Sequence, residues 1–141
     1  MALQQSSELR DLFSRFYQAM EAGDASQALE LVSREQGGLS IGTDPAEWWN
    51  DYATLERVYA AQLPEMRAAG VRFLPGEVAC YQEGTVGWCA DRPRILLPDG
   101  TEQSMRLTAV FHKEEDTWKM VQSHASFGVP NTDALGTDLT T

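Results

Sequence analysis

The stretch MRLTAVFHKEEDTWKMVQSHASF, residues 105–127, has the pattern of a long antiparallel β-hairpin and is the most informative segment for the architecture. Two runs in which apolar and polar residues alternate, 105–112 and 118–127, flank four polar residues at 114–117. Alternation with a period of two is typical of a strand that is buried on one side. The hairpin therefore predicts a sheet with one apolar face, which other elements must cover.

The register of this hairpin predicts which side chains share the covered face. With 114–117 as the loop, the predicted cross-strand pairs are Lys113 with Trp118, Phe111 with Met120, Ala109 with Gln122, Leu107 with His124, and Met105 with Ser126. A slip by one residue would exchange the two faces of the sheet. The chosen register gathers six apolar residues on the face toward the helices, with Gln122 and His124 near one end: Met105, Leu107, Ala109, Phe111, Trp118 and Met120.

A second predicted hairpin precedes this one. Residues 78–82 and 86–92 flank Gly84-Thr85, a two-residue turn with glycine first. Counting from the turn places Cys80 opposite Cys89 as a non-hydrogen-bonded pair, in which side chains approach most closely. We expect two free, adjacent thiols, because the Cβ separation of such a pair, about 4.5–5.5 Å, is wider than a relaxed disulfide prefers. A reducing compartment would disfavour the bond further.

The N-terminal half of the chain has helical periodicity. An apolar stripe at helical spacing predicts the first helix: Leu9, Leu12, Phe13, Phe16, Tyr17 and Met20. Gly23 ends that helix, and Asp24 caps a short second one. The segment Asp44-Pro45-Ala46-Glu47 has the residues of a helix start, so Trp48 and Trp49 are expected in a first helical turn.

A third helix is predicted at about residues 53–69, with a kink or a break at Pro64. Helices followed by consecutive hairpins indicate an α+β fold, in which N-terminal helices pack on a curved, mostly antiparallel sheet. We assign residues 1–130 to one domain. Residues 131–141 are polar and have no apolar period, so we expect a disordered tail there.

Composition and charge restrict the classes of partner. The chain of 141 residues has 21 acidic and 11 basic residues, which gives a net charge of −10. Such a surface repels phosphate backbones and anionic lipid, so we expect neither nucleic-acid binding nor membrane binding. No apolar run approaches the roughly 18 residues of a membrane span, and the first ten residues do not resemble a signal peptide. A cytoplasmic location is the expectation that follows.

No cofactor and no metal are expected from the sequence. The chain has two histidines and two cysteines, and none of them shows the spacing of metal ligands. It also has none of the short motifs that mark phosphate-binding loops, dinucleotide-binding folds, serine hydrolases or zinc proteases.

Two segments suggest a family. Residues 41–49, IGTDPAEWW, resemble the strand-to-helix segment of SnoaL-like proteins, and WKMVQSHAS at 118–126, running on to Pro130, resembles their last strand. The chain thus resembles the SnoaL-like branch of the nuclear transport factor 2-like superfamily. This resemblance implies a cone with a pocket between helices and sheet, and homodimers formed through the outer face of the sheet. Tyr81 and Trp88 are expected to share that outer face.

The resemblance also implies candidate functional residues. Asp44 before Pro45 is similar in position to the general-base aspartate of ketosteroid isomerases. The place of their oxyanion-hole tyrosine is taken by Phe16, with Tyr17 one residue off, and the sequence has no match for their second acidic residue. An imidazole on an apolar inner face makes His124 the best candidate for acid–base chemistry. The expected ligand pocket comprises Tyr17, Trp48, Trp49, Met105, Leu107, Phe111, Trp118, Met120 and Gln122.

Structural interpretations of the same residues stay open. His124 could be a core histidine bonded to a neighbouring carbonyl or hydroxyl group, and the aromatic residues could simply fill the core. Asp44 suits an N-cap, and bonds to helix amides favour its charged form, which opposes use as a strong base.

The sequence is compatible with two functions. The first is an enzyme or binder for an apolar or aromatic small molecule, with isomerase, cyclase or dehydratase chemistry as the options that the resemblance offers. The second is a non-catalytic dimerisation or scaffold domain, because the last strand also resembles the association domain of calmodulin-dependent kinase II. That domain has a Val-His-x-His-x-Ser-Gly pattern. In the present sequence Gln122 stands in place of the first histidine, and Phe127 separates Ser126 from Gly128. A pocket filled by the protein's own side chains would favour the second function.

Overall fold

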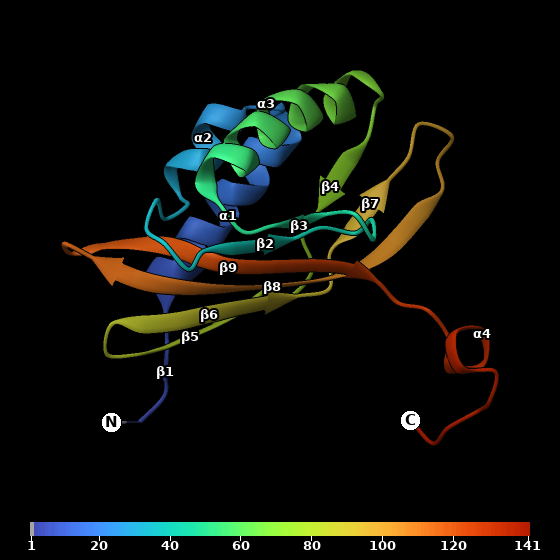
Figure 1. The fold of residues 1–141 in the computed structure, drawn as a ribbon. Coiled ribbons are helices and arrows are strands. Elements are labelled where there is room, and N and C mark those ends of the chain that lie inside the picture. Colours follow the sequence, from blue (N-terminus) through green and yellow to red (C-terminus); the bar gives the residue numbers. More distant parts are fainter. Residues whose placement is uncertain (1) are drawn as a thin grey trace.

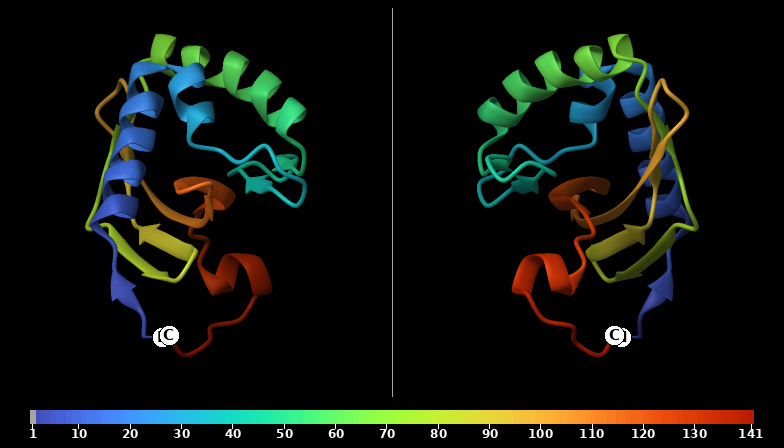
Figure 2. Two further views of the ribbon diagram at one scale, coloured as in Figure 1. Left: turned by 90° about the vertical axis from the view of Figure 1, so that its left-hand side faces the viewer. Right: turned by 90° about the vertical axis from the view of Figure 1, so that its right-hand side faces the viewer.

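The computed structural model describes residues 2–141, and they form the predicted α+β architecture. Three helices, α1 (Ser7–Ala22), α2 (Ala25–Glu30) and α3 (Tyr52–Ala68), lie on one side of a strongly curved sheet (Figures 1 and 2). The sheet runs in the order β1-β5-β6-β8-β9-β2-β3, and β4 joins it through β7, which pairs with β8. Of these strand pairs, only β2 with β9 is parallel, so the sheet is mostly antiparallel as predicted.

The strands have the following bounds. The N-terminal half contributes β1 (Gln4–Gln5), β2 (Leu39–Ile41), β3 (Trp48–Trp49) and β4 (Arg72–Leu74). The C-terminal half contributes β5 (Ala79–Glu83), β6 (Val86–Asp91), β7 (Arg94–Leu96), β8 (Glu102–Glu114) and β9 (Thr117–Phe127).

The first helix forms as its apolar stripe predicts. The Ser6 hydroxyl accepts a hydrogen bond from the Leu9 amide at the N-terminus, and Gly23 ends the helix in a left-handed conformation with φ of 68°. Five residues of the stripe are buried, and Met20 packs against them: Leu9, Leu12, Phe13, Phe16 and Tyr17. The predicted cap of α2 is also correct, since Asp24 accepts from the Gln27 amide. Burial of this stripe against the sheet is what holds the helical layer in place.

The predicted helix start at Asp44 is wrong, although its local hydrogen bonds form. The Asp44 carboxylate accepts from the Ala46 amide at 2.8 Å, and the Asp44 amide donates to the Glu47 carboxylate. The Gly42 amide then donates to the Glu47 carbonyl group, and this bond turns the chain into a β2–β3 hairpin. Trp48 and Trp49 are therefore strand residues, and α3 begins only at Tyr52, where Asp51 caps it. The helix continues through Pro64 without a break.

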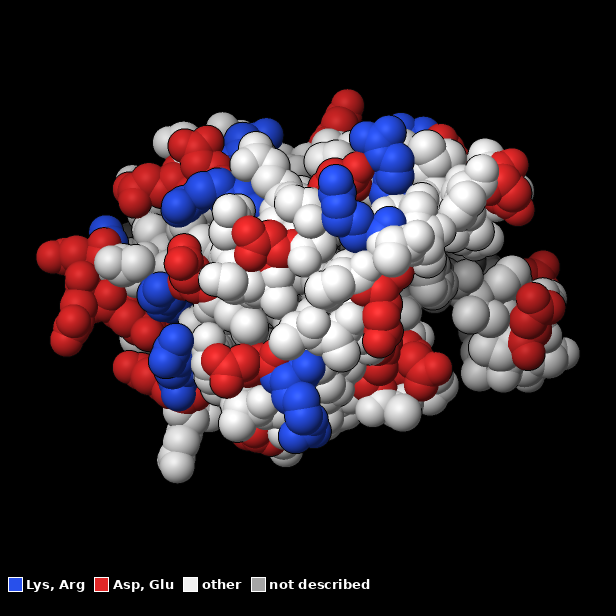
Figure 3. All heavy atoms as spheres, turned by 90° about the horizontal axis from the view of Figure 1, so that it is seen from above, with Lys and Arg blue, Asp and Glu red and all other residues white. Residues whose placement is uncertain are grey.

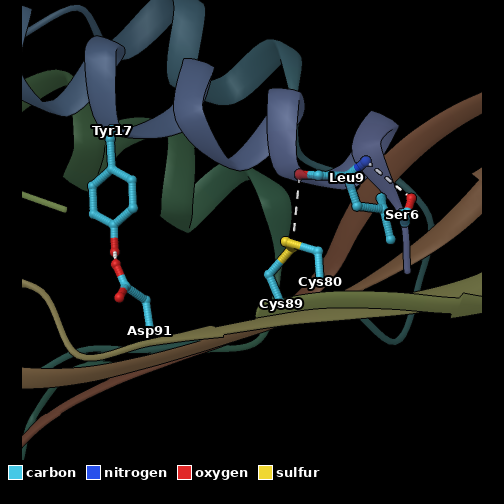
Figure 4. The surroundings of a disulfide bond; sticks show 6 residues. All are labelled: Ser6, Leu9, Tyr17, Cys80, Cys89 and Asp91. Atoms are coloured by element: carbon cyan, nitrogen blue, oxygen red, sulfur yellow. Dashed lines mark hydrogen bonds between the residues drawn. A yellow bond between two sulfur atoms is a disulfide. The ribbon is translucent and has the colours of Figure 1, made fainter. Parts of the chain in front are cut away.

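The β5–β6 hairpin has the predicted register, but the expectation of free thiols is wrong. Cys80 and Cys89 face each other with their Cα atoms 4.2 Å apart and form a disulfide. Both are buried beneath α1, and the sulfur of Cys89 lies 3.7 Å from the Leu9 carbonyl oxygen (Figure 4). The close approach of a non-hydrogen-bonded pair, together with the helix above it, brings the two sulfurs within bonding reach.

Thiol titration of the unfolded protein, prepared without reductant, is expected to count no thiols, and prior reduction should raise the count to two. Chain entropy limits the stabilisation by this disulfide to about 2–3 kcal/mol, because it closes a short loop. The hydrogen bonds of the hairpin already constrain the same loop. Urea unfolding of the Cys80→Ala/Cys89→Ala variant measures that contribution. A count of two without reductant would contradict the bond.

The β8–β9 hairpin keeps its predicted register only near its turn. Lys113 pairs with Trp118 and Phe111 with Met120, as expected. A bulge then inserts one extra residue, Val121, on β9, so that Val110 lies opposite Gln122. Beyond this point the predicted partners of Ala109, Leu107 and Met105 are wrong, and the pairs are Ala109 with Ser123, Leu107 with Ala125, and Met105 with Phe127.

The bulge turns Gln122 and His124 to the outer face of the sheet, where both are exposed. It lies where the edge partner of β9 changes. On one side, Met120 bonds to the backbones of Leu31 and Ser33, whereas residues 122–124 pair with β2. The expectation that His124 faces the helices is therefore wrong, because one extra residue reverses the alternation.

Residues beyond Pro130 contain one element that the sequence did not predict. The short helix α4 spans Asn131–Leu135 and ends at Gly136, which has a φ of 72°. It has no buried residue and lies apart from the sheet and the helical layer (Figure 1). Among residues 2–141, no helix is long and apolar enough to cross a membrane.

Candidate functional site

A cavity of about 130 Å³ lies between the helices and the concave face of the sheet. Its wall is mostly apolar. From α1 it receives Phe16, Tyr17 and Met20, from α3 Tyr59, Leu63 and Met66, and from the sheet Trp49, Met105, Leu107 and Ala125. Enclosure by apolar and aromatic side chains with a few polar groups is the usual make-up of a small-molecule site.

One polar group near this wall belongs to Tyr17, which lines the cavity. The Tyr17 hydroxyl donates a 2.6 Å hydrogen bond to Oδ2 of Asp91 (Figure 4). The same carboxylate oxygen also accepts from the Gly76 amide at 3.0 Å. Asp91 is 6% exposed, and its Oδ1 has no hydrogen-bond partner among residues 2–141. Burial raises the pKa of Tyr17 above its ordinary value, and the hydrogen bond and negative charge of Asp91 raise it further. The tyrosine is therefore held neutral.

A second polar group lies where the β2–β3 hairpin meets α3. The Glu47 carboxylate accepts hydrogen bonds from the Asp44 amide at 2.9 Å and from the Gln62 side chain at 2.8 Å. Glu47 and Gln62 both line the cavity, as do Ser40 and Tyr59. Burial raises the pKa of Tyr59 to about 12; a hydrogen bond with Ser40 opposes this rise, and the charge of Glu47 adds to it.

The raised pKa of Tyr59 predicts that the free energy of unfolding falls as the pH rises from about 10 to about 12. In the unfolded chain Tyr59 loses its proton near pH 10.0, whereas the folded protein retains that proton up to about pH 12. Unfolding therefore releases a proton in this window, and a difference of two pKa units corresponds to about 3 kcal/mol. Urea unfolding measured below pH 10 and near pH 12 should show this loss, with a smaller loss in Tyr59→Phe. An equal loss in the variant would contradict the assignment to Tyr59.

The expected pocket residues and the two catalytic candidates, His124 and Asp44, lie in three different environments. Tyr17, Trp49, Met105 and Leu107 line the cavity. Three others are buried in the core near the β8–β9 turn and do not line it: Phe111, Trp118 and Met120. Trp48, Gln122, His124 and Asp44 are exposed and stand outside the cavity wall.

Sequence reasoning missed several polar residues beside the cavity. Asp91 could have been found from the sequence, because alternation along β6 puts Gly87, Cys89 and Asp91 on one face. A carboxylate on a buried face requires a hydrogen-bond partner. Glu47 could not have been found from the sequence, because its position depends on the hairpin that replaces the predicted helix start. Ser123 and Ala125 enter the wall in place of Gln122 and His124 as a consequence of the bulge.

Comparisons with solved structures show the same fold in proteins of low sequence identity. An NTF2-like protein of unknown function from Pseudomonas putida KT2440 is 16% identical, with a TM-score of 0.77 over 87% of this chain and 89% of that one. A proposed dehydratase of the NTF2-like family from Streptomyces avermitilis is 21% identical, with a TM-score of 0.70 over 86% and 95%. A proposed calcium/calmodulin-dependent protein kinase II association domain from Xanthomonas campestris is 17% identical, with a TM-score of 0.69 over 86% of each chain.

A comparison with curated proteins found no match. The family model of the SnoaL-like domain matches residues 9–130, which is most of the chain and includes every residue of the cavity wall. The resemblance inferred from residues 41–49 and 118–130 is thereby confirmed. This chain belongs to the SnoaL-like domain family, within the NTF2-like fold.

Proposed function

We propose that the protein binds a small apolar compound of about one ring in the cavity between α1, α3 and the sheet. The observation that carries this proposal is the cavity itself, about 130 Å³ with an apolar wall. An engineered apolar protein cavity of about 150 Å³ binds benzene, so this volume suits a monocyclic compound. The cavity is also not filled by the protein's own side chains, which favours ligand binding over a purely structural domain.

The polar groups of the wall indicate what else the ligand carries. The Tyr17 hydroxyl donates its proton to Asp91, which leaves the phenolic oxygen to accept a hydrogen bond. A ligand with a hydroxyl or amino group on its ring would satisfy that oxygen. Any isomerase, cyclase or dehydratase step in the cavity would use Glu47 or the Tyr17–Asp91 pair, because His124 lies on the opposite face of β9.

The test is binding of one-ring phenols and anilines, measured by calorimetry together with native mass spectrometry of compounds that co-purify. Ala125→Phe should fill the cavity and reduce affinity at least about tenfold, while Tyr17→Phe should weaken only ligands that have a donor group. His124→Phe is the matched control, because it adds the same ring to the same strand on the outer face. Binding that survives in Ala125→Phe, or weakens equally in His124→Phe, would exclude this cavity.

A second candidate is the dimerisation domain, and one observation favours it. Tyr81 and Trp88 stack on the outer face of the sheet, with ring centroids 6.4 Å apart, and Val110 pairs with Trp88 beside them. Helices α1, α2 and α3 cover the opposite face (Figure 2). We infer a homodimer through this apolar patch, which does not compete with ligand binding. Light scattering should report a dimer that Trp88→Asp converts to a monomer, and a wild-type monomer at micromolar concentration would contradict the inference.

We also propose a cytoplasmic location, as the sequence leads us to expect. The buried disulfide is more typical of an oxidising compartment. The redox state of Cys80 and Cys89 in protein trapped directly from cells decides between the two, since reduced cysteines would support the cytoplasm.

A further inference from the structure

Three side chains that could ligate a metal converge at the end of the sheet away from the cavity. They are Glu35, His112 and Glu114, and one ligand atom from each lies within 4.8 Å of the other two. His112 and Glu114 are two residues apart on β8, so they project from the same face of the strand. Glu35 comes from the segment after α2, which the bridge between Val32 and Met120 holds against β9.

A serine connects the two carboxylate residues of this group. The Ser33 hydroxyl donates a 2.6 Å hydrogen bond to Oε2 of Glu114 and accepts one of 3.1 Å from the Glu35 amide. Ser33 itself is 4% exposed, and its backbone bonds to Met120. His112 belongs to the interior of the sheet, paired with Val86 on one side and Lys119 on the other. The ligand-bearing backbones are therefore fixed, and the serine orients one carboxylate as outer-shell partners do in metal sites.

The charge around the group attracts a cation. Two carboxylates this close repel each other, and a divalent ion between them removes that repulsion. Glu115 lines the same surface depression, and acidic side chains gather over the β8–β9 turn at the left end of Figure 3. Lys119 also borders the depression, and its ammonium group, which keeps its charge, donates to the Glu30 carbonyl oxygen. Three carboxylates against one ammonium group leave the lining of the depression negative, and the imidazole distinguishes this group from a purely acidic cluster.

We propose that Glu35, His112 and Glu114 form a binding site for a divalent transition metal, with Zn²⁺ as the preferred ion. One imidazole nitrogen and two carboxylate oxygens suit Zn²⁺, whose bonds to such ligands are about 2.0–2.2 Å, whereas Ca²⁺ and Mg²⁺ prefer oxygen ligands alone. Ligands at those bond lengths lie roughly 3.3–3.6 Å apart in a tetrahedron, so the ligand atoms must approach one another by up to about 1.5 Å. Glu35 is exposed and can supply this movement by a rotamer change. Three protein ligands leave the fourth position to water.

The test is calorimetric titration of ZnCl₂ into the untagged, metal-free, oxidised full chain. We expect one equivalent to bind and CaCl₂ to give no binding. His112→Asn, Glu35→Gln and Glu114→Gln should each weaken Zn²⁺ at least about tenfold, since even the loss of an outer-shell partner costs 10–100-fold. Circular dichroism should show that each variant keeps its fold.

Two variants serve as matched controls, and both should bind like the wild type. Glu115→Gln removes a carboxylate from the same depression without removing a proposed ligand, and His124→Asn removes the other histidine. Absence of Zn²⁺ binding would overturn the proposal. So would binding that persists in the His112→Asn variant or disappears in the His124→Asn variant. The site lies outside the cavity wall, so its failure would leave the proposed ligand function unaffected.

Discussion

Replacing Phe13 by alanine is expected to lower the free energy of unfolding by about 3–5 kcal/mol. Phe13 is fully buried, and its ring contacts Tyr17 edge-on at 5.2 Å and Phe111 edge-on at 6.5 Å between centroids. It therefore joins α1 to β8 at the centre of the core. Neither the helix nor the strand can close the resulting void without repacking the other, so the cost should lie in the upper part of the range for such cavities.

Urea unfolding measures this effect as a shift of the midpoint with an unchanged slope. For a domain whose total stability is typically about 5–15 kcal/mol, the loss is a large fraction. The control is Leu135→Ala in α4, which removes an equally apolar side chain that is 62% exposed and should change stability by less than about 0.5 kcal/mol. Similar shifts for the two variants would show that Phe13 is not a core residue.

Replacing Gly87 by valine is expected to cost about 3 kcal/mol, at the upper end of the range for overpacking. A Cβ atom at this position would lie 2.3 Å from Cδ1 of Leu9 and 2.8 Å from the carbonyl oxygen of Tyr81. Leu9 is fully buried and the Tyr81 oxygen belongs to the backbone, so neither atom can move aside easily. Helix α1 thus approaches β6 at this point because the residue beneath it has no side chain.

The matched control is Gly128→Val, because a Cβ atom there has no neighbour within 4 Å. Leu9→Ala should partly relieve the clash, so the Leu9→Ala/Gly87→Val double variant should be less destabilised than the sum of the two single variants. Strict additivity would mean that the strain arises elsewhere. Thermal or urea unfolding of the wild type, Leu9→Ala, Gly87→Val and the double variant completes this double-mutant cycle.

The sequence was sufficient for the parts of this fold that local chemistry determines. The apolar stripe of α1, its end at Gly23, and the register around Gly84 all depend on residues close together in the chain. Sequence reasoning failed where a local pattern fits two structures or where a distant partner decides. The Asp44 segment has the hydrogen bonds of a helix start, but Gly42 and Glu47 close a hairpin instead.

The candidate site was only partly predictable for the same reason. Tyr17 and Leu107 followed from helical and strand periodicity, but Val121 has no feature that marks a bulge, such as a glycine. Its extra residue moved His124 out of the expected pocket and brought Ala125 in. The Glu35–His112–Glu114 group joins residues about eighty positions apart, and no local spacing could have revealed it.

The bulge at Val121 also divides β9 into two segments that can be altered independently. Trp118 and Met120 on the turn side fill the core, whereas Ser123 and Ala125 beyond the bulge face the cavity. A change of cavity shape at 123 or 125 therefore leaves the packing beneath the turn intact. The turn side of β9 thus maintains the core, while the segment beyond the bulge can vary with the ligand. Directed evolution of new ligand preferences should therefore begin with positions 123 and 125.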